Sequence, residues 1–83
     1  MAANSHGSTP TSSAFAITPS DTVDLDVAVR GIYVGAGGNL RVLLEDDTSP
    51  VTLVGVITGV IYPLRVRRVY SSSTTASSLI GLT

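Results

Sequence analysis

The sequence predicts an all-β fold, a small antiparallel β-sandwich or barrel of about six to seven short strands. Three observations indicate it: apolar and polar residues alternate in several segments, turn-forming Gly, Pro, Ser and Asp residues recur about every 8 to 12 residues, and no segment has helical spacing. With 83 residues the chain forms one small domain at most. We expect a flexible N-terminal arm over residues 1–13 and a single β domain over residues 14–83.

The arm residues are small, polar and without periodicity, which is typical of a flexible segment. In an assembly such an arm can become ordered against a neighbouring subunit. Residues 14–17 predict a first short strand anchored by Phe15, the only phenylalanine in the chain. Residues 18–22 predict a turn, because Pro restricts φ and Ser and Asp side chains bond to nearby backbone.

Residues 23–30 alternate between apolar and polar side chains and predict a second strand. Asp24 and Asp26 would then share one face of this strand. A pair of carboxylates can serve acid–base catalysis, but no His or further acid is placed by the sequence to complete such a site. A solvated strand face, or an arginine of a neighbouring subunit as partner, is the favoured interpretation.

Residues 30–45 predict a β-hairpin. Ile, Tyr and Val at 32–34 favour a strand, residues 35–39 (Gly-Ala-Gly-Gly-Asn) supply a loop that reaches positive φ, and residues 40–45 alternate again. A phosphate-binding loop would need a Lys and a Ser or Thr after the last glycine, followed by a helix. Because Asn39-Leu40-Arg41-Val42 follows instead, we interpret the glycines as a turn.

Residues 45–50 (Glu-Asp-Asp-Thr-Ser-Pro) predict a second reversal. Its acidic side chains lack the ligand spacing of an EF-hand calcium loop, so a specific cation is not expected. Residues 51–56 predict a strand that is apolar on both faces, with one face in the core and the other, including Val54 and Val56, available to a partner. Residues 58–59 predict a turn, and Pro63 ends the short strand before it.

Residues 64–70 predict the last long strand, in which the adjacent Arg67 and Arg68 break the alternation and indicate a bulge. The chain has a net charge of −1, no lysine and no stacking aromatics between the arginines, which argues against a nucleic-acid site. Arginine also pairs well with carboxylates at protein interfaces, which favours Arg65, Arg67 and Arg68 as interface residues; the alternative is a solvated strand edge. A polar loop over 71–78 and a final strand over 79–82 complete the domain.

The composition indicates a subunit of an oligomer. The chain is 43% hydrophobic and only 13% charged, whereas globular chains carry about 25% charged residues. A domain this small buries only about 60% of its unfolded surface and needs support. It has no cysteine for disulfides, and one His and one Glu make a metal cage improbable, so oligomerisation remains. Our candidate interface residues are Phe15, Arg30, Tyr33, Val54, Val56, Arg65, Arg67 and Arg68.

The sequence also disfavours several functional classes. The one His is in the arm and the chain has no Cys, so we expect no enzyme, no catalytic residues and no cofactor or metal. No apolar run reaches the roughly 18 to 20 residues of a membrane helix, and the start lacks the features of a signal peptide. A carbohydrate-binding β module is a weaker alternative, because such sites need exposed aromatic platforms and this chain has three Tyr and one Phe.

Three ordered motifs resemble the spike base protein family of gene transfer agents and related tailed bacteriophages. They are Ile17-Thr-Pro-Ser-Asp21, then Val29-Arg-Gly-Ile-Tyr-Val-Gly-Ala-Gly-Gly-Asn-Leu-Arg-Val42, then Pro63-Leu-Arg-Val-Arg-Arg-Val69 with Thr74-Thr75-Ala76 after it. The resemblance covers roughly residues 14–83, and Arg30-Gly31 departs from the Arg-Ala expected in the family.

This resemblance implies a structural virion protein on the outer surface of the capsid. Several copies would anchor a head spike or fibre to the major capsid protein, and no catalytic residues are implied. A pentamer would fit a fivefold vertex. The alternative is a trimeric cement or decoration protein that stabilises capsomer contacts and carries no fibre.

Overall fold

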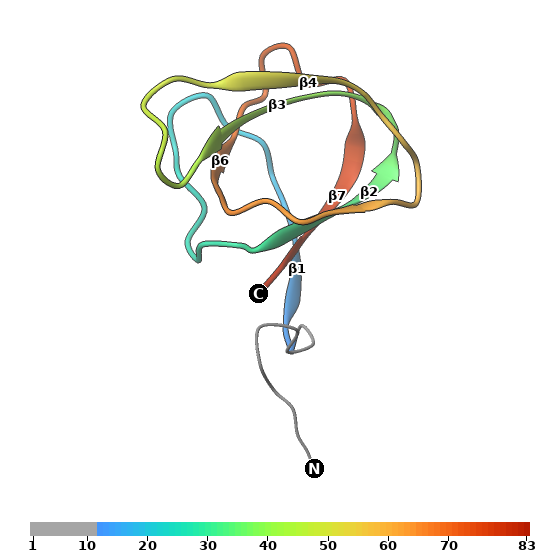
Figure 1. Ribbon diagram of the computed structural model, residues 1–83, viewed down its shortest axis with the longest axis horizontal. Coiled ribbons are helices and arrows are strands. Elements are labelled where there is room, and N and C mark those ends of the chain that lie inside the picture. Colours follow the sequence, from blue (N-terminus) through green and yellow to red (C-terminus); the bar gives the residue numbers. More distant parts are fainter. Residues whose placement is uncertain (1–11) are drawn as a thin grey trace.

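The computed structural model describes residues 12–83, which form seven strands and no helix (Figure 1). The all-β prediction is therefore confirmed. The strands are β1 (Ala14–Ala16), β2 (Gly31–Ala36), β3 (Gly38–Leu44), β4 (Val51–Val56), β5 (Ile61–Tyr62), β6 (Val66–Val69) and β7 (Ser77–Leu82).

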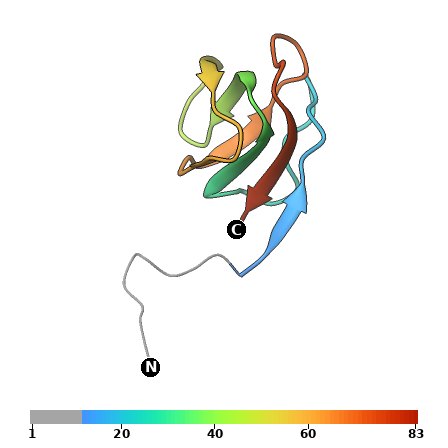
Figure 2. The ribbon, with the colours of Figure 1, turned by 90° about the vertical axis from the view of Figure 1, so that its right-hand side faces the viewer.

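The strands form two antiparallel sheets that pack as two layers (Figure 2). The four-stranded sheet has the order β1-β7-β2-β5, and the three-stranded sheet has the order β4-β3-β6. The C-terminal strand β7 lies between β1 and β2, so residues from both ends of the domain pair in one sheet. The two edge strands β4 and β5 are consecutive in the chain, whereas β1 and β6 are the opposite edges.

The predicted hairpin over residues 30–45 is wrong in its pairing, although both of its strands exist. β2 pairs with β5 and β7, while β3 pairs with β4 and β6, so the chain passes from one sheet to the other at Gly37. A tight hairpin of type I′ needs two residues with positive φ. Within 35–39 only Gly38 has one, at 155°. The glycines instead permit close packing: a Cβ on Gly35 would lie 2.5 Å from Ser78, and one on Gly37 would lie 2.4 Å from the carbonyl oxygen of Val56.

The predicted strand over residues 23–30 is also wrong. This segment is irregular apart from one bridge between Val29 and Val66, and it bends at 21–22 and 26–27. Its alternation does not correspond to one buried face, because Val29 is buried and Leu25 half-buried, while Val23 and Val27 are 62% and 54% exposed.

Instead, the segment runs along the edge of β6. We call residues 20–29 the edge strap. The backbone N–H groups of Ser20 and Leu25 donate to the carbonyl groups of Val69 and Arg67 in β6, at 2.8 and 2.9 Å. The strap thus occupies the open edge of β6, which would otherwise present unpaired backbone groups to solvent.

The remaining elements predicted within residues 12–83 agree with the structure, whereas the arm predicted over residues 1–13 lies outside the described residues except for its last two positions. Residues 45–50 reverse the chain between β3 and β4, and β5 ends immediately before Pro63. The bulge falls at Arg67, since Leu43 of β3 pairs with Arg68 and the next residue, Leu44, pairs with Val66. Because of this extra residue, Val66 and Val69 both face the core although they are three positions apart.

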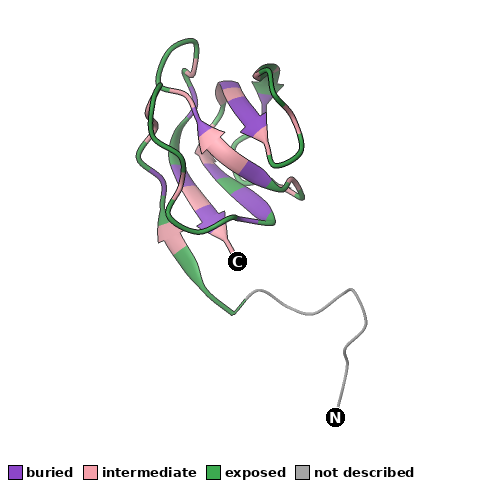
Figure 3. Ribbon diagram, turned by 90° about the vertical axis from the view of Figure 1, so that its left-hand side faces the viewer, coloured by how far each residue is buried: buried purple, intermediate pink, exposed green. Residues whose placement is uncertain are grey.

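The core lies between the two sheets, where the inward faces of the strands are buried and the connections are exposed (Figure 3). Full burial of one such aliphatic side chain contributes about 1.5 to 3 kcal/mol relative to exposure. The core cluster consists of Ile17, Val29, Ile32, Val34, Leu40, Val42, Val56, Val66, Val69, Ala76 and Leu79.

Candidate interaction surfaces

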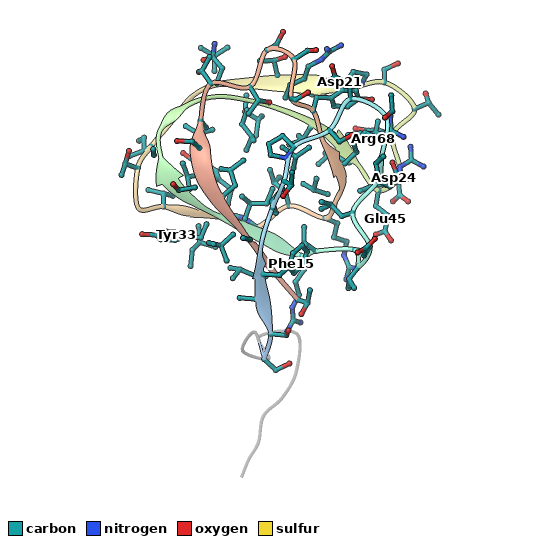
Figure 4. All side chains as sticks on the ribbon, turned by 180° about the vertical axis from the view of Figure 1, so that it is seen from behind. Phe15, Asp21, Asp24, Tyr33, Glu45 and Arg68 are labelled. Carbon is teal, nitrogen blue, oxygen red and sulfur yellow. The ribbon has the colours of Figure 1, made fainter. Side chains whose placement is uncertain are left out.

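Arg68 is bound within its own chain. Its Nε donates to Oδ1 of Asp24 in the edge strap at 2.7 Å, and its Nη1 donates to the carbonyl oxygen of Asp21 at 3.2 Å. The hydrogen bond to Asp24 raises the pKa of Arg68 above its ordinary value. Figure 4 shows Asp21, Asp24 and Arg68 together on one side of the domain. Asp24, for which the sequence favoured a solvated face or an arginine of another subunit, thus has an intramolecular partner.

Asp21 connects the edge strap to the loop after β6. Its carboxylate accepts hydrogen bonds from the backbone N–H groups of Ser71 and Ser72, at 3.0 and 2.9 Å, and from the hydroxyl group of Ser72. The Ser72 bonds, the side-chain one foremost, lower the pKa of Asp21 below its ordinary value. The negative charge of Asp21 therefore stabilises the turn at 71–72.

Tyr70 has a guanidinium group over its ring from each of two neighbouring strands. Arg41 Cζ in β3 lies 4.8 Å from the ring centroid, and Arg68 Cζ lies 5.5 Å from it. Both distances fall in the range of cation–π contacts. Because the ring is covered in this way, Tyr70 does not offer a platform for stacking a sugar.

The other arginines differ in their surroundings. Arg65 is mostly exposed and lies 3.8 Å from Glu45, a distance at which a surface ion pair contributes little. Arg67 Nη2 donates to the carbonyl oxygen of Asp47 at 3.0 Å, and its buried Nε has no hydrogen-bond partner among the described residues. Arg30 is exposed, and its Nη2 donates to the carbonyl oxygen of Thr83 at 3.3 Å.

Among residues 12–83, most of the exposed large apolar side chains belong to two sets. We call the first set the apolar ridge; it occupies β4, β5, the turn between them and the adjoining position of β2. Within it Tyr33 pairs with Ile61 across the strands, and Val54 is 79% exposed. Its members are Tyr33, Val54, Ile57, Val60 and Ile61.

The second set lies in an open groove of about 480 Å³ between β1 and the edge strap, which we call the strap groove. The exposed Val23 and Val27 line it together with Phe15 and Leu25, and Asp24 and Asp26 also contribute to its wall. Asp24 is already paired with Arg68, so covering this part of the groove would not isolate its charge.

The candidate interface residues fall into four groups. Tyr33 and Val54 belong to the apolar ridge, and Phe15 lines the strap groove while it also packs against the core. Val56 is buried in the core at 6% exposure, so its side chain faces inward rather than outward as expected for a partner-facing position. The four arginines make the intramolecular contacts described above.

Five exposed apolar residues were not among our candidate interface residues: Ile57, Val60, Ile61, Val23 and Val27. The signal for the first three was present, because residues 51–62 form a run without any charged residue. For Val23 and Val27 the regular alternation of the strap concealed that only every second apolar residue turns inward.

The described residues hold neither a metal-binding cluster nor a membrane-spanning helix. Among residues 12–83, no group of three or more His, Cys, Asp or Glu side chains is arranged to hold a metal ion. No helix in this part of the chain is long and apolar enough to span a membrane.

Comparisons with known proteins give one informative result. No protein-family model matches the sequence, and no curated protein matches it. Among solved structures, the chain is similar to a chain in the capsid of a native gene transfer agent (GTA) particle, a structure computed with C5 symmetry. The two are 36% identical, the TM-score is 0.80, and the match covers 89% of this chain and 84% of that chain.

Proposed function

The chain belongs to the family of the matched GTA capsid chain, and from this we propose that it is a structural protein that assembles on the capsid of a virion-like particle. The match carries the proposal because it extends over nearly the whole domain in both chains, with 36% identity. Similarity in both sequence and fold supports a shared function, whereas a shared β-sandwich fold alone would not.

More specifically, we propose that the protein is an oligomeric base on the outer capsid surface that anchors a head spike or fibre to the major capsid protein. The ordered motifs in Ile17–Asp21, Val29–Val42 and Pro63–Val69 support this specific role. The surface of the domain supports an assembly of copies. Among residues 12–83, seven of the eight exposed large apolar residues belong to two sets, and each set offers a contact face.

A pentamer is the favoured assembly, because five copies can surround one fivefold axis of a capsid and the matched structure was computed with C5 symmetry. The alternative, a trimeric cement protein between capsomers, uses the same apolar faces and differs in copy number and position. A carbohydrate-binding module has less support, because Tyr70 is covered by two arginines and the Tyr62 hydroxyl group is bound to the backbone of Ile57.

Deletion of the gene tests this function directly. Purified particles without the protein should keep an intact capsid shell but lack a density at the fivefold vertices in electron cryomicroscopy, and the attached fibre should disappear with it. Complementation with the wild-type gene should restore both densities. Loss of density between capsomers, with a less stable shell, would indicate the cement function instead. Particles that are unchanged by the deletion would contradict a capsid role.

A further inference from the structure

The apolar ridge and the strap groove lie on opposite sides of the domain. The ridge surrounds the turn that joins the edge strands β4 and β5, and the groove lies between the edge strand β1 and the strap that covers β6. Figure 4 shows this separation, with Tyr33 of the ridge on one side and Asp24 of the groove wall on the other. A ridge therefore cannot reach the groove of its own chain.

We propose that the apolar ridge of one copy packs into the strap groove of the next copy. The occupant of the groove is thus a second copy of this chain, and the inference rests on the proposed function in requiring an oligomer. The contact is heterologous, because two different surfaces meet, and repetition of such a contact produces a closed ring when the rotation between copies permits it. The capsid that holds the matched chain was computed with C5 symmetry, and a ring of five fits on a fivefold axis.

The distribution of apolar side chains supports this pairing. Of the eight large apolar residues that are exposed in the described part of the chain, five belong to the ridge and two to the groove. Only Val51 lies outside both. Scattered exposed aliphatic residues need no explanation, whereas exposed apolar residues concentrated in two sets are typical of interaction surfaces.

Shape and charge are compatible with the contact. The ridge contains no charged residue and follows a tight turn at Thr58-Gly59, while the groove is open and holds a volume of about 480 Å³. Asp24 is neutralised by Arg68, so only Asp26 has to remain at the solvated rim. A standard interface takes about 800 Å² from each partner. Two such faces would use about a third of the 4822 Å² surface of one copy.

Charged substitutions test the two faces separately. Ile57→Asp places a charge on the ridge, and Val27→Asp places a charge in the groove. Because both sites are exposed, each variant should keep the β circular dichroism spectrum of the wild type. In native mass spectrometry each variant should lose the wild-type oligomer and appear at the monomer mass of 8.5 kDa. Val51→Asp, at an exposed apolar site outside both faces, is the matched control and should keep the oligomer.

Mixing the two variants distinguishes this contact from a symmetric one. Ile57→Asp retains a working groove and Val27→Asp retains a working ridge, so an equimolar mixture should form a dimer with one copy of each and proceed no further. If the ridges instead contacted each other across a twofold axis, the mixture would contain dimers of Val27→Asp with itself. That result would overturn the proposal.

Cross-linking provides the closing experiment, because the chain has no natural cysteine. In the double variant Ile57→Cys/Val27→Cys, oxidation should join successive copies and produce a ladder that ends at the mass of the complete ring. Val51→Cys/Val27→Cys should give no ladder. The same oxidation is carried out on purified particles that carry the variant in place of the wild-type protein.

The outcomes separate the two proposals. An oligomer that persists in both charged variants, with no ladder in solution or on particles, overturns the ridge–groove contact but leaves the capsid function intact. A wild-type chain that is absent from purified particles overturns the capsid function whatever the result in solution. A chain that is present on particles as isolated copies, with no ladder, also overturns the contact.

Discussion

Arg68 in β6 donates from Nε to the Asp24 carboxylate 2.7 Å away, and this bond fastens the edge strap to the strand that the strap covers. The same guanidinium group reaches the carbonyl oxygen of Asp21 and lies over the ring of Tyr70. One side chain thus connects the strap with the outer face of the three-stranded sheet.

Replacement of Arg68 by Ala should loosen the strap without unfolding the domain. The amide protons of Ser20 and Leu25, which bond to β6, should exchange with solvent faster than in the wild type, because the side-chain contacts that hold the strap are lost. The amide protons of β7 should be unaffected. Arg65→Ala, at an exposed arginine with only a 3.8 Å ion pair, is the control. Equal exchange in both variants would show that Arg68 does not hold the strap.

Asp21→Asn should destabilise the domain in a pH-dependent manner. The folded-state pKa of Asp21 lies below its ordinary value of 3.8, so the carboxylate stabilises the fold fully above that pH. Its contribution is lost as the pH falls through the folded-state pKa. The difference in unfolding free energy between wild type and variant, measured with urea, should therefore be constant near neutral pH and shrink under acid conditions. Asp26→Asn, which removes a strap carboxylate other than the one that accepts from Ser71 and Ser72, is the matched control for the loss of a surface charge.

Gly37→Ala should destabilise the crossing between the two sheets. The added Cβ would lie 2.4 Å from the carbonyl oxygen of Val56 and 3.1 Å from the backbone nitrogen of Thr58, so the backbone must move. Such overpacking costs about 1 to 3 kcal/mol in unfolding free energy. Gly59→Ala is the informative comparison, because its Cβ would meet open space and only its φ of 83° opposes the change. Greater stability of Gly37→Ala than of Gly59→Ala would contradict the tight crossing.

Leu40→Ala should remove most of the stability of an isolated domain. Leu40 is completely buried between the sheets, and truncation of such a leucine costs about 2 to 5 kcal/mol. Since a small domain has little stability to lose, the variant should be largely unfolded by circular dichroism. Val54→Ala, at an exposed site of the ridge, should change the unfolding free energy of the monomer by no more than about 0.5 kcal/mol.

The strand positions could be predicted from the sequence, whereas the partners of two segments could not. Alternation and turn residues placed all seven strands, together with one over residues 23–30 that is not formed, and the paired arginines 67 and 68 indicated the bulge. The hairpin prediction failed because a glycine-rich connection serves equally well for a tight turn and for close passage between sheets. Only the neighbours of Gly35 and Gly37, Ser78 and Val56, decide which applies.

The candidate surfaces, too, could be predicted from the sequence only in part. The apolar composition indicated that part of the surface is completed by other chains, and the uncharged run over residues 51–62 marks where one apolar face lies. Val56, within that run, is nevertheless buried, and the strap's Val23 and Val27 are exposed although they alternate like core residues. Periodicity reports which side chains share a face only if the segment is regular.

The sequence by itself therefore determined the class of fold, the location of the strands and the high apolar content of the surface, because these follow from local alternation, turn chemistry and overall composition. The tertiary structure alone decided which strands pair, that residues 20–29 cover β6, and that the ridge and the groove lie on opposite sides. These depend on contacts between residues far apart in the chain, such as Arg68 with Asp24 and Tyr33 with Ile61, and no local pattern encodes such contacts.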